Sequence, residues 1–253
     1  MARQDTLTLF TGSIGNIVFY KTQDGYLARK KGGISAERIR SEAAFARTRE
    51  NNAEFTRCGS AIKLLRTALG PLVRGTADNR LAGRLTRELM KVIVSDAINP
   101  RGARNVTDGD TTLLENFDFN VHGKLAQIFH APYTAAIDRA TGNMTIDIPA
   151  FLTHTMIVVP EGATHFRFTS AGASVDFNGH TFIAKTAESD LLPLDGEVSG
   201  PIQITHTVTP SGVPLLLVLG IEFEQIVNDT PKPLQNSRSN ALAIVKVDTG
   251  RAE

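Results

Sequence analysis

Four basic side chains recur every three or four residues between positions 80 and 91 of this sequence. They are Arg80, Arg84, Arg87 and Lys91. In a helix this spacing places all four on one line, where they could bind an anionic group such as a carboxylate or a phosphate. The same spacing is typical of an ordinary surface helix that packs its opposite, apolar stripe on a core. That stripe is Leu81, Leu85, Leu89 and Val92, with Asp78 placed to cap the helix N-terminus.

A group of acidic side chains lies far along the chain, between two predicted strands. It consists of Glu188, Asp190, Asp195 and Glu197, in a region punctuated by glycine and proline. Complementary charges guide the encounter of two surfaces, although each exposed pair contributes only about 0.2–1 kcal/mol. We therefore predict a contact between the basic line and the acidic group, either within one chain or between neighbouring copies.

Patterns for covalent or cofactor chemistry are missing. No Gly-x-Ser-x-Gly segment supports a nucleophile elbow, and no Gly-rich segment has the spacing of a phosphate-binding or dinucleotide-binding loop. Cys58, the single cysteine, excludes an internal disulfide and falls on the apolar seam of a predicted helix, which favours a buried, inert thiol. We expect no catalytic residue and no cofactor.

Patterns for metal binding are weak as well. None of the six histidines stands in a His-x-His or His-x-x-x-His pair, although His165 and His180 could meet across a hairpin. The segment Asp108-Gly109-Asp110 is similar to the start of a calcium loop, but its glycine comes too early for that motif. Ordinary surface histidines and an acidic linker are the simpler interpretations, so we expect no metal site.

The net charge of +1 hides a strong asymmetry along the chain. Residues 1–105 contain 19 Lys and Arg against 9 Asp and Glu, whereas residues 106–253 contain 8 against 17. A basic half of this kind can bind nucleic acid, and Tyr20 and Tyr26 could stack on bases. Glutamates interleave with the arginines, however, which suits salt bridges better than a continuous anion track. Those glutamates are Glu37, Glu42, Glu50 and Glu54.

The elements that must position these charges begin with a β-ribbon. Alternating apolar residues predict three strands, at residues 7–10, 17–21 and 26–30. A ribbon of this size is marginal alone and should pack on a larger structure. Two predicted helices follow, over residues 54–69 and 78–98. Gly70-Pro71 ends the first of them, and we expect the pair to form an antiparallel hairpin.

The chain changes character after the breaker cluster at residues 99–102. Beyond residue 110 we predict strands and no long helix, with Asn178-Gly179 as a two-residue hairpin turn. Many short strands with regular turns indicate an antiparallel sandwich or barrel. The predicted strands are residues 117–121, 125–129, 133–138, 144–148, 156–159, 165–170, 174–177, 181–184, 202–208, 215–225 and 241–247.

Three segments of the first 51 residues carry a resemblance. They are Gly12-Ser-Ile-Gly-Asn16, Phe19-Tyr-Lys-Thr-Gln-Asp-Gly-Tyr26 and Ala44-Phe-Ala-Arg-Thr-Arg-Glu-Asn51. In these segments the chain resembles a family of uncharacterised bacterial proteins of about this length. The resemblance runs through most of the chain and is firmest in its first third. It implies a bacterial source and brings no activity or functional residue.

These patterns predict an α+β protein of two domains. Residues 1–105 would form a basic β-ribbon with a helical hairpin, and residues 106–253 an acidic antiparallel β-sandwich, of which a jelly roll is one form. The preferred function is structural: a non-enzymatic, self-assembling subunit of a homo-oligomer, filament, tube or shell, whose partners are copies of itself. The alternatives are nucleic-acid binding by the basic half, and a hydrolase or metal site on the sandwich.

The expected location follows from two further features of the sequence. The longest apolar run, residues 213–221, is too short to span a membrane. The first residues lack the apolar segment of a signal peptide. The expected location is therefore the cytoplasm, with export by a signal-less route left open.

Overall fold

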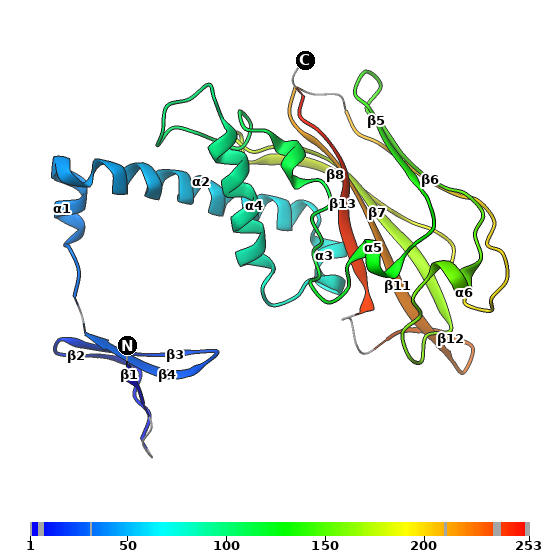
Figure 1. The fold of residues 1–253 in the computed structure, drawn as a ribbon, viewed down its shortest axis with the longest axis horizontal. Helices are drawn as coiled ribbons and strands as arrows, with labels where there is room; N and C mark the ends of the chain where they lie inside the picture. The colour runs from blue at the N-terminus through cyan, green and yellow to red at the C-terminus, as the bar shows by residue number, and fades with distance from the viewer. Residues whose placement is uncertain (1, 5–7, 31, 210–211, 235–238, 251–253) are drawn as a thin grey trace. The chain divides into compact units, whose positions relative to one another are not determined.

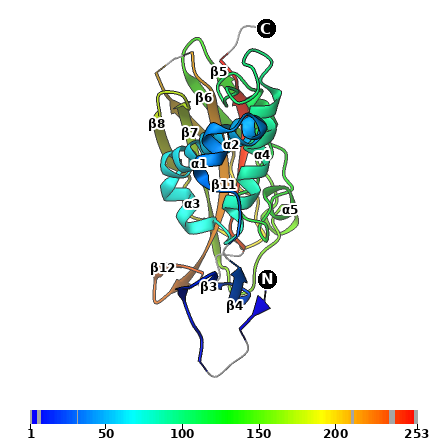
Figure 2. The ribbon, with the colours of Figure 1, turned by 90° about the vertical axis from the view of Figure 1, so that its left-hand side faces the viewer.

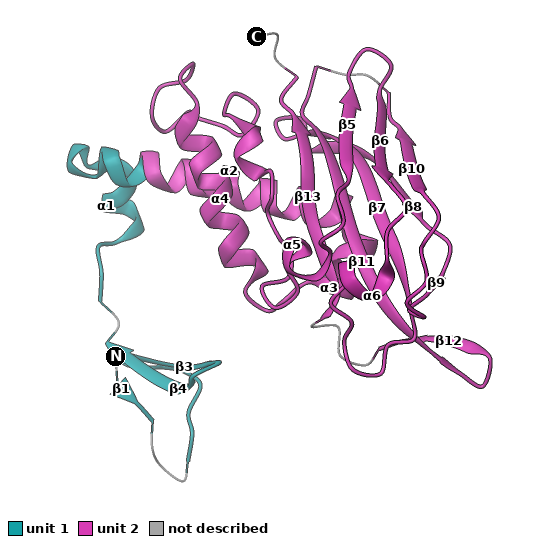
Figure 3. Cartoon of the chain, turned by 45° about the vertical axis from the view of Figure 1, so that its right-hand side comes forward, with its two compact units in different colours: residues 1–49 teal, residues 50–253 magenta. Residues whose placement is uncertain are grey.

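The computed structural model describes residues 2–4, 8–30, 32–209, 212–234 and 239–250. The chain divides into two compact units, residues 1–49 and residues 50–253 (Figure 3). The division therefore falls after residue 49 and not after residue 105, where the sequence had predicted it. The reason is that the helices of residues 50–105 bury their apolar stripes in the same core as the C-terminal strands.

Unit 1 contains a four-stranded antiparallel sheet with the order β1-β4-β3-β2. Its strands are β1 (Ala2–Arg3), β2 (Gly12–Ile14), β3 (Ile17–Thr22) and β4 (Gly25–Lys30). The predicted strands at 17–21 and 26–30 are confirmed. The predicted strand at 7–10 is wrong for residues 8–10, and residue 7 lies outside the described residues. Two short helical segments follow, α1 (Ala36–Ser41) and η1 (Ala43–Phe45).

Three helices of unit 2 form one layer. They are α2 (Ala46–Ala68), whose first turn belongs to unit 1, α3 (Gly70–Thr76) and α4 (Leu81–Ser95). Gly70-Pro71 does not lead into a loop but starts α3, because proline in the first turn has no intrahelical N–H bond to lose. The expected antiparallel hairpin is wrong, since α4 crosses α2 steeply (Figures 1 and 2).

Two antiparallel sheets complete unit 2. The larger sheet consists of β7 (His165–Asp176), β8 (Thr181–Glu188), β9 (Leu192–Pro193), β11 (Leu215–Val227), β12 (Thr230–Pro233) and β13 (Ala241–Asp248). The smaller consists of β5 (Thr134–Asp138), β6 (Asn143–Ile148) and β10 (Ile202–Thr207), in the order β10-β6-β5. The protein is therefore α+β with a β-sandwich. Its sheets have six and three described strands, whereas a jelly roll has eight strands in two sheets.

The larger sheet is covered on both faces. In β7, Ala171, Ala173 and Val175 pack in the core shared with the helices, whereas Phe166 and Phe168 pack in the core shared with the smaller sheet. Figure 2 shows α2, α3 and α4 in front of this sheet. Strands buried on both faces have nearly continuous apolar sequences, which explains the long apolar run of β11.

Several strand predictions after residue 110 are wrong in detail. Residues 125–129 contain the helical turn α5 (Leu125–Ile128), and residues 156–159 begin with the last residue of the helical turn α6 (Thr153–Met156). A single bridge joins Phe129 and Ile157. The predicted strands at 165–170 and 174–177 are one strand, β7. The other described helical segment after residue 110, η2 (Thr111–Leu114), also has four residues, so the predicted absence of a long helix is confirmed for the described residues.

Candidate functional site

Arg84, at the centre of the predicted basic line, forms its ion pair and hydrogen bonds within its own chain. Its guanidinium pairs with Asp78 and donates to the carbonyl oxygens of Asp118 at 2.6 Å and Phe119 at 3.0 Å. These bonds fasten α4 to the loop before α5. Asp78 is not the N-cap, because α4 begins two residues later than predicted, with Arg80 at that position. The Asp78 carboxylate instead accepts hydrogen bonds from the backbone N–H groups of Arg80 and Val121.

The other members of the basic line are exposed, but two are partly neutralised by their own helix. Glu88 lies between Arg87 and Lys91 and pairs with both, at 2.9 and 2.5 Å. Arg80 is exposed. The line therefore presents less positive charge than its sequence indicates.

The predicted acidic group remains largely available at the surface. Glu188 pairs with Arg167 at 2.9 Å. Asp190, Asp195 and Glu197 are exposed and form no ion pair with any residue that the structure describes. None of the ion pairs among described residues joins the acidic group to the basic line.

His165 and His180, which the sequence allowed to meet across a hairpin, lie far apart. His165 opens β7, and His180 lies beyond its other end, in the turn to β8. The strand between them spans about 3.3 Å per residue, so the two rings lie at opposite ends of the sheet. The described residues contain no group of three or more His, Cys, Asp or Glu side chains that could hold a metal ion.

The segment Asp108-Gly109-Asp110 is a packed loop rather than a plain linker. Asp108 Oδ2 accepts hydrogen bonds from the side-chain amides of Asn99 and Asn105, at 2.8 and 2.7 Å. A Cβ on Gly109 would lie 2.0 Å from the carbonyl oxygen of Val92 in α4, so only glycine allows this close approach. These partners explain the short acidic sequence without a calcium ion.

A buried serine–histidine pair links the two sheets. Ser170 Oγ lies 2.8 Å from His206 Nε2 and 2.7 Å from the carbonyl oxygen of Val218. A carbonyl oxygen can only accept, so the Ser170 hydroxyl donates to Val218 and receives a hydrogen bond from His206 Nε2–H. These roles are opposite to those of a nucleophile and its base. A Cβ on Gly172 would lie 2.7 Å from the Cβ of His206, so glycine lets β10 approach β7 here.

His206 should make the stability of unit 2 sensitive to mild acid. Burial, with a smaller contribution from the Lys185 charge, lowers the pKa of His206. The unfolded chain then binds a proton more readily than the folded chain below about pH 6.5. The free energy of unfolding should therefore fall between pH 7 and pH 5, by at most about 1.4 kcal/mol per pH unit from this group.

The matched variant is His206→Gln, because an amide N–H can still donate to Ser170 and does not titrate. Urea unfolding at a series of pH values should give a shallower pH dependence for the variant than for the wild type. Equal slopes for the two proteins would contradict the assignment.

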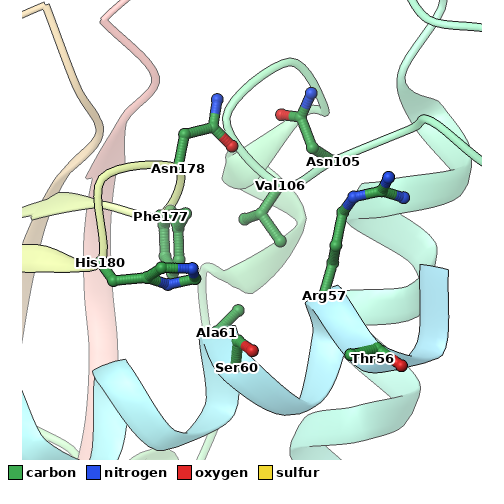
Figure 4. A pocket seen from close by; sticks show the side chains of 9 residues that line it. All are labelled: Thr56, Arg57, Ser60, Ala61, Asn105, Val106, Phe177, Asn178 and His180. Carbon is green, nitrogen blue, oxygen red and sulfur yellow. The ribbon is translucent and has the colours of Figure 1, made fainter. Parts of the chain in front are cut away.

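A groove lies between α2 and the tip of the β7–β8 hairpin, and we name it the α2–hairpin groove. Its first cavity, of about 290 Å³, is drawn with its nine lining residues in Figure 4. Arg57 and Ser60 come from α2, and Asn178 and His180 from the hairpin. A second cavity, of about 350 Å³, shares Ser60 and His180 and extends along α2. Lys63, Leu64, Thr67 and Phe182 also line it.

Basic and hydroxyl side chains surround an apolar floor in this groove. Val106 and Phe177 form the floor of the first cavity, and no carboxylate lines either cavity. The nearest carboxylates along the chain are engaged: Glu54 with Arg104, Asp108 with Asn105, and Asp176 with the N–H groups of Asn178 and Gly179. An apolar floor with a few polar groups is the usual composition of a binding site.

His180 holds an unusual backbone conformation beside the groove. Its φ is 54°, in the left-handed region that few residues other than glycine adopt. The neighbouring Gly179 is needed for contact with Asp176, because a Cβ there would lie 2.3 Å from the Asp176 carboxylate. The expected two-residue turn at Asn178-Gly179 is therefore a four-residue turn, residues 177–180. Figure 4 shows the His180 ring at the rim of the hollow.

The sheet of unit 1 has an apolar face that the described residues of unit 1 cover only in part, since the rings of Phe10 and Phe19 pack with their centroids 5.7 Å apart. Cross-strand pairing places Ile14 beside Ile17, and Phe19 beside Ala28. Ile14 is 61% exposed and Ile17 is 44% exposed. None of the described residues in 1–49 is buried. An open hollow of about 710 Å³ lies over this face, lined in part by Ile17, Ala28 and Lys30.

The predicted stacking residues Tyr20 and Tyr26 are instead covered by neighbouring basic side chains.

Comparison with known proteins does not assign this chain to any class of protein. No family model matches the chain, and no curated protein and no solved structure is significantly similar to it. In the described part of the chain, no helix has both the length and the apolar character needed to cross a membrane. The proposals below therefore rest on the geometry and charge of the chain itself.

Proposed function

We propose that this protein is a structural subunit that assembles with copies of itself through the apolar face of the unit 1 sheet. The observation that carries the proposal is that the described residues of unit 1 leave most of this face exposed, although Phe10 packs on Phe19. Ile14, Ile17, Phe19 and Ala28 lie on one side of the sheet, and no described residue of unit 1 is buried.

The energetics of a small sheet support the need for a partner. Ordering each residue of a strand costs about 1–2 kcal/mol of backbone entropy. A sheet of this size offsets that cost only when a hydrophobic face is covered. A partner surface over Ile14 and Ile17 would supply the missing burial, at about 25 cal/mol per Å² of apolar surface.

Charge supports a second copy as that partner. Unit 1 contains 9 Lys and Arg against 4 Asp and Glu, whereas unit 2 contains 18 against 22. Unit 1 of one copy and unit 2 of another therefore attract each other. A contact between two different surfaces is heterologous, so it closes into a ring or continues as a filament.

Sedimentation velocity over a range of protein concentrations, with negative-stain imaging, tests this proposal. We expect the mean sedimentation coefficient to rise with concentration, and rings or filaments to appear in the images. Single subunits at the highest concentration would contradict it. Tight binding of the wild type to DNA or RNA, with a steep salt dependence, would favour the nucleic-acid alternative instead.

A further inference from the structure

We propose that the α2–hairpin groove of one copy binds an acidic ridge of the next copy, formed by Asp195, Glu197 and Val198 with the neighbouring Leu152. This inference rests on the proposed self-assembly and names two surfaces that meet in it. The basic surface of this contact is therefore the groove, with Lys63, Arg57 and His180. It is not the line of basic residues on α4.

The ridge carries acidic and apolar side chains that complement the basic and apolar side chains of the groove. Val198 is 60% exposed and Leu152 is 42% exposed, and the two are joined by an isolated β-bridge. Asp195 and Glu197 precede Val198 and are exposed without an ion pair among described residues. An apolar centre flanked by carboxylates therefore meets an apolar floor flanked by basic groups, the usual layout of an interface with a polar rim.

Backbone hydrogen bonds fix the ridge before any partner arrives. The N–H of Thr153 donates to the carbonyl oxygen of Glu197 at 3.3 Å, and the N–H of Ser199 donates to that of Phe151 at 2.9 Å. Asp195 Oδ1 accepts from the N–H of Glu197 at 3.0 Å. A surface held in this way loses little conformational entropy on binding.

The polar groups that α2 contributes to the groove lie along one side of the helix, and among them the Thr67 hydroxyl donates to the carbonyl oxygen of Lys63 at 2.8 Å. Ser60, Lys63 and Thr67 recur at the spacing of one helical face, and Lys63 and His180 form no ion pair within the described chain. Arg57 is partly engaged, since its Nη1 donates to the carbonyl oxygen of Gly102 at 2.7 Å. Lys63 is therefore available to a partner, whereas Arg57 is partly engaged within its own chain.

One copy cannot bring its own ridge into its own groove. The groove lies at the Asp176–Thr181 end of the β7–β8 hairpin. The chain leading into the ridge pairs with the other end of β7, where Leu192 faces Phe166 and Pro193 faces His165. The intervening strand separates the two by about 3.3 Å per residue. The contact must therefore be intermolecular, and its head-to-tail geometry propagates copies along one direction.

Charge reversal on each side tests the contact. Lys63→Glu and Asp195→Lys should each weaken association of the full chain about tenfold by sedimentation velocity, because repulsion replaces attraction at that position. An equimolar mixture of the two variants should assemble again, because the intact groove of Asp195→Lys can bind the intact ridge of Lys63→Glu, and the two reversed surfaces also carry opposite charges. Arg66→Glu is the matched control, since Arg66 is exposed on α2 and does not line the groove. Thermal unfolding should be the same for all variants.

The outcomes separate this inference from the proposed function. Assembly of Lys63→Glu like the wild type, or equal impairment by Arg66→Glu, would overturn the groove–ridge contact while self-assembly stands. A wild type that never assembles would overturn both. Lys63-dependent binding of an RNA or DNA oligonucleotide, with assembly unaffected by Lys63→Glu, would reassign the groove to nucleic acid.

Discussion

Replacing Arg104 with methionine is expected to lower the free energy of unfolding by about 3–5 kcal/mol. Glu54 on α2 is only 2% exposed, and Arg104 binds both of its oxygens, at 2.8 and 3.0 Å. The N–H of Gly102 adds a third bond, at 2.8 Å. Removing Arg104 leaves a buried carboxylate without its counter-charge, which is one of the costlier single changes a protein can suffer.

Two further variants make this prediction specific. Arg101 pairs with Glu50 at 3.4 Å, with side chains 44% and 31% exposed, so Arg101→Met should cost less than about 1 kcal/mol. Replacing both Glu54 and Arg104 with methionine should recover much of the loss, because no buried charge remains. Urea unfolding measures all three variants, and a loss below about 1 kcal/mol in Arg104→Met would contradict the prediction.

The pH dependence of the Arg104 variant should change sign. The hydrogen bond from Arg104 lowers the pKa of Glu54 in the folded protein, against burial, which raises it. In the wild type this pair therefore stabilises the fold above the unfolded pKa of Glu54, and the contribution is lost as pH falls. Without Arg104 burial dominates and the neutral acid is favoured, so the deficit of the variant should shrink on acidification.

The sequence correctly predicted the elements whose apolar residues recur at regular spacing. The helical stripe of α4 and the strands β5, β6, β10, β11 and β13 lie where the pattern placed them. The failures at 125–129 and 156–159 have a common cause. Both segments are short, and tertiary packing places a helical turn at 125–128 and another that ends at Met156, so that each segment contributes one residue to the single bridge between Phe129 and Ile157.

The candidate site was harder to predict than the fold. Periodicity correctly placed Arg84 on a helix line, but its partners Asp118 and Phe119 are supplied by a loop 34 and 35 residues away. The groove was missed because the polar positions of α2 look like the solvated side of its apolar seam. The one available signal was the three- and four-residue spacing of Ser60, Lys63 and Thr67.

Replacing Ile17 with aspartate is expected to prevent association through the apolar face of the unit 1 sheet. Ile17 pairs with Ile14 in β2 and lines the open hollow on the apolar face. Full burial of an isoleucine side chain contributes about 1.5–3 kcal/mol, and burying an unpaired carboxylate there adds a further penalty. The association constant should therefore fall by more than about 100-fold. Sedimentation velocity measures the loss.

The neighbouring residue of the same strand provides the control for this variant. Val18 pairs with Arg29 and points to the opposite face of the sheet. Val18→Asp places the same poor strand former in β3, and therefore tests whether a weakened sheet alone prevents assembly. We expect Val18→Asp to assemble like the wild type and Ile17→Asp to lose the contact through the apolar face of the unit 1 sheet, with the same urea unfolding of unit 2 in both. The opposite result would place the contact on the Val18 face, and equal loss in both variants would show that sheet stability, rather than the apolar face, limits assembly.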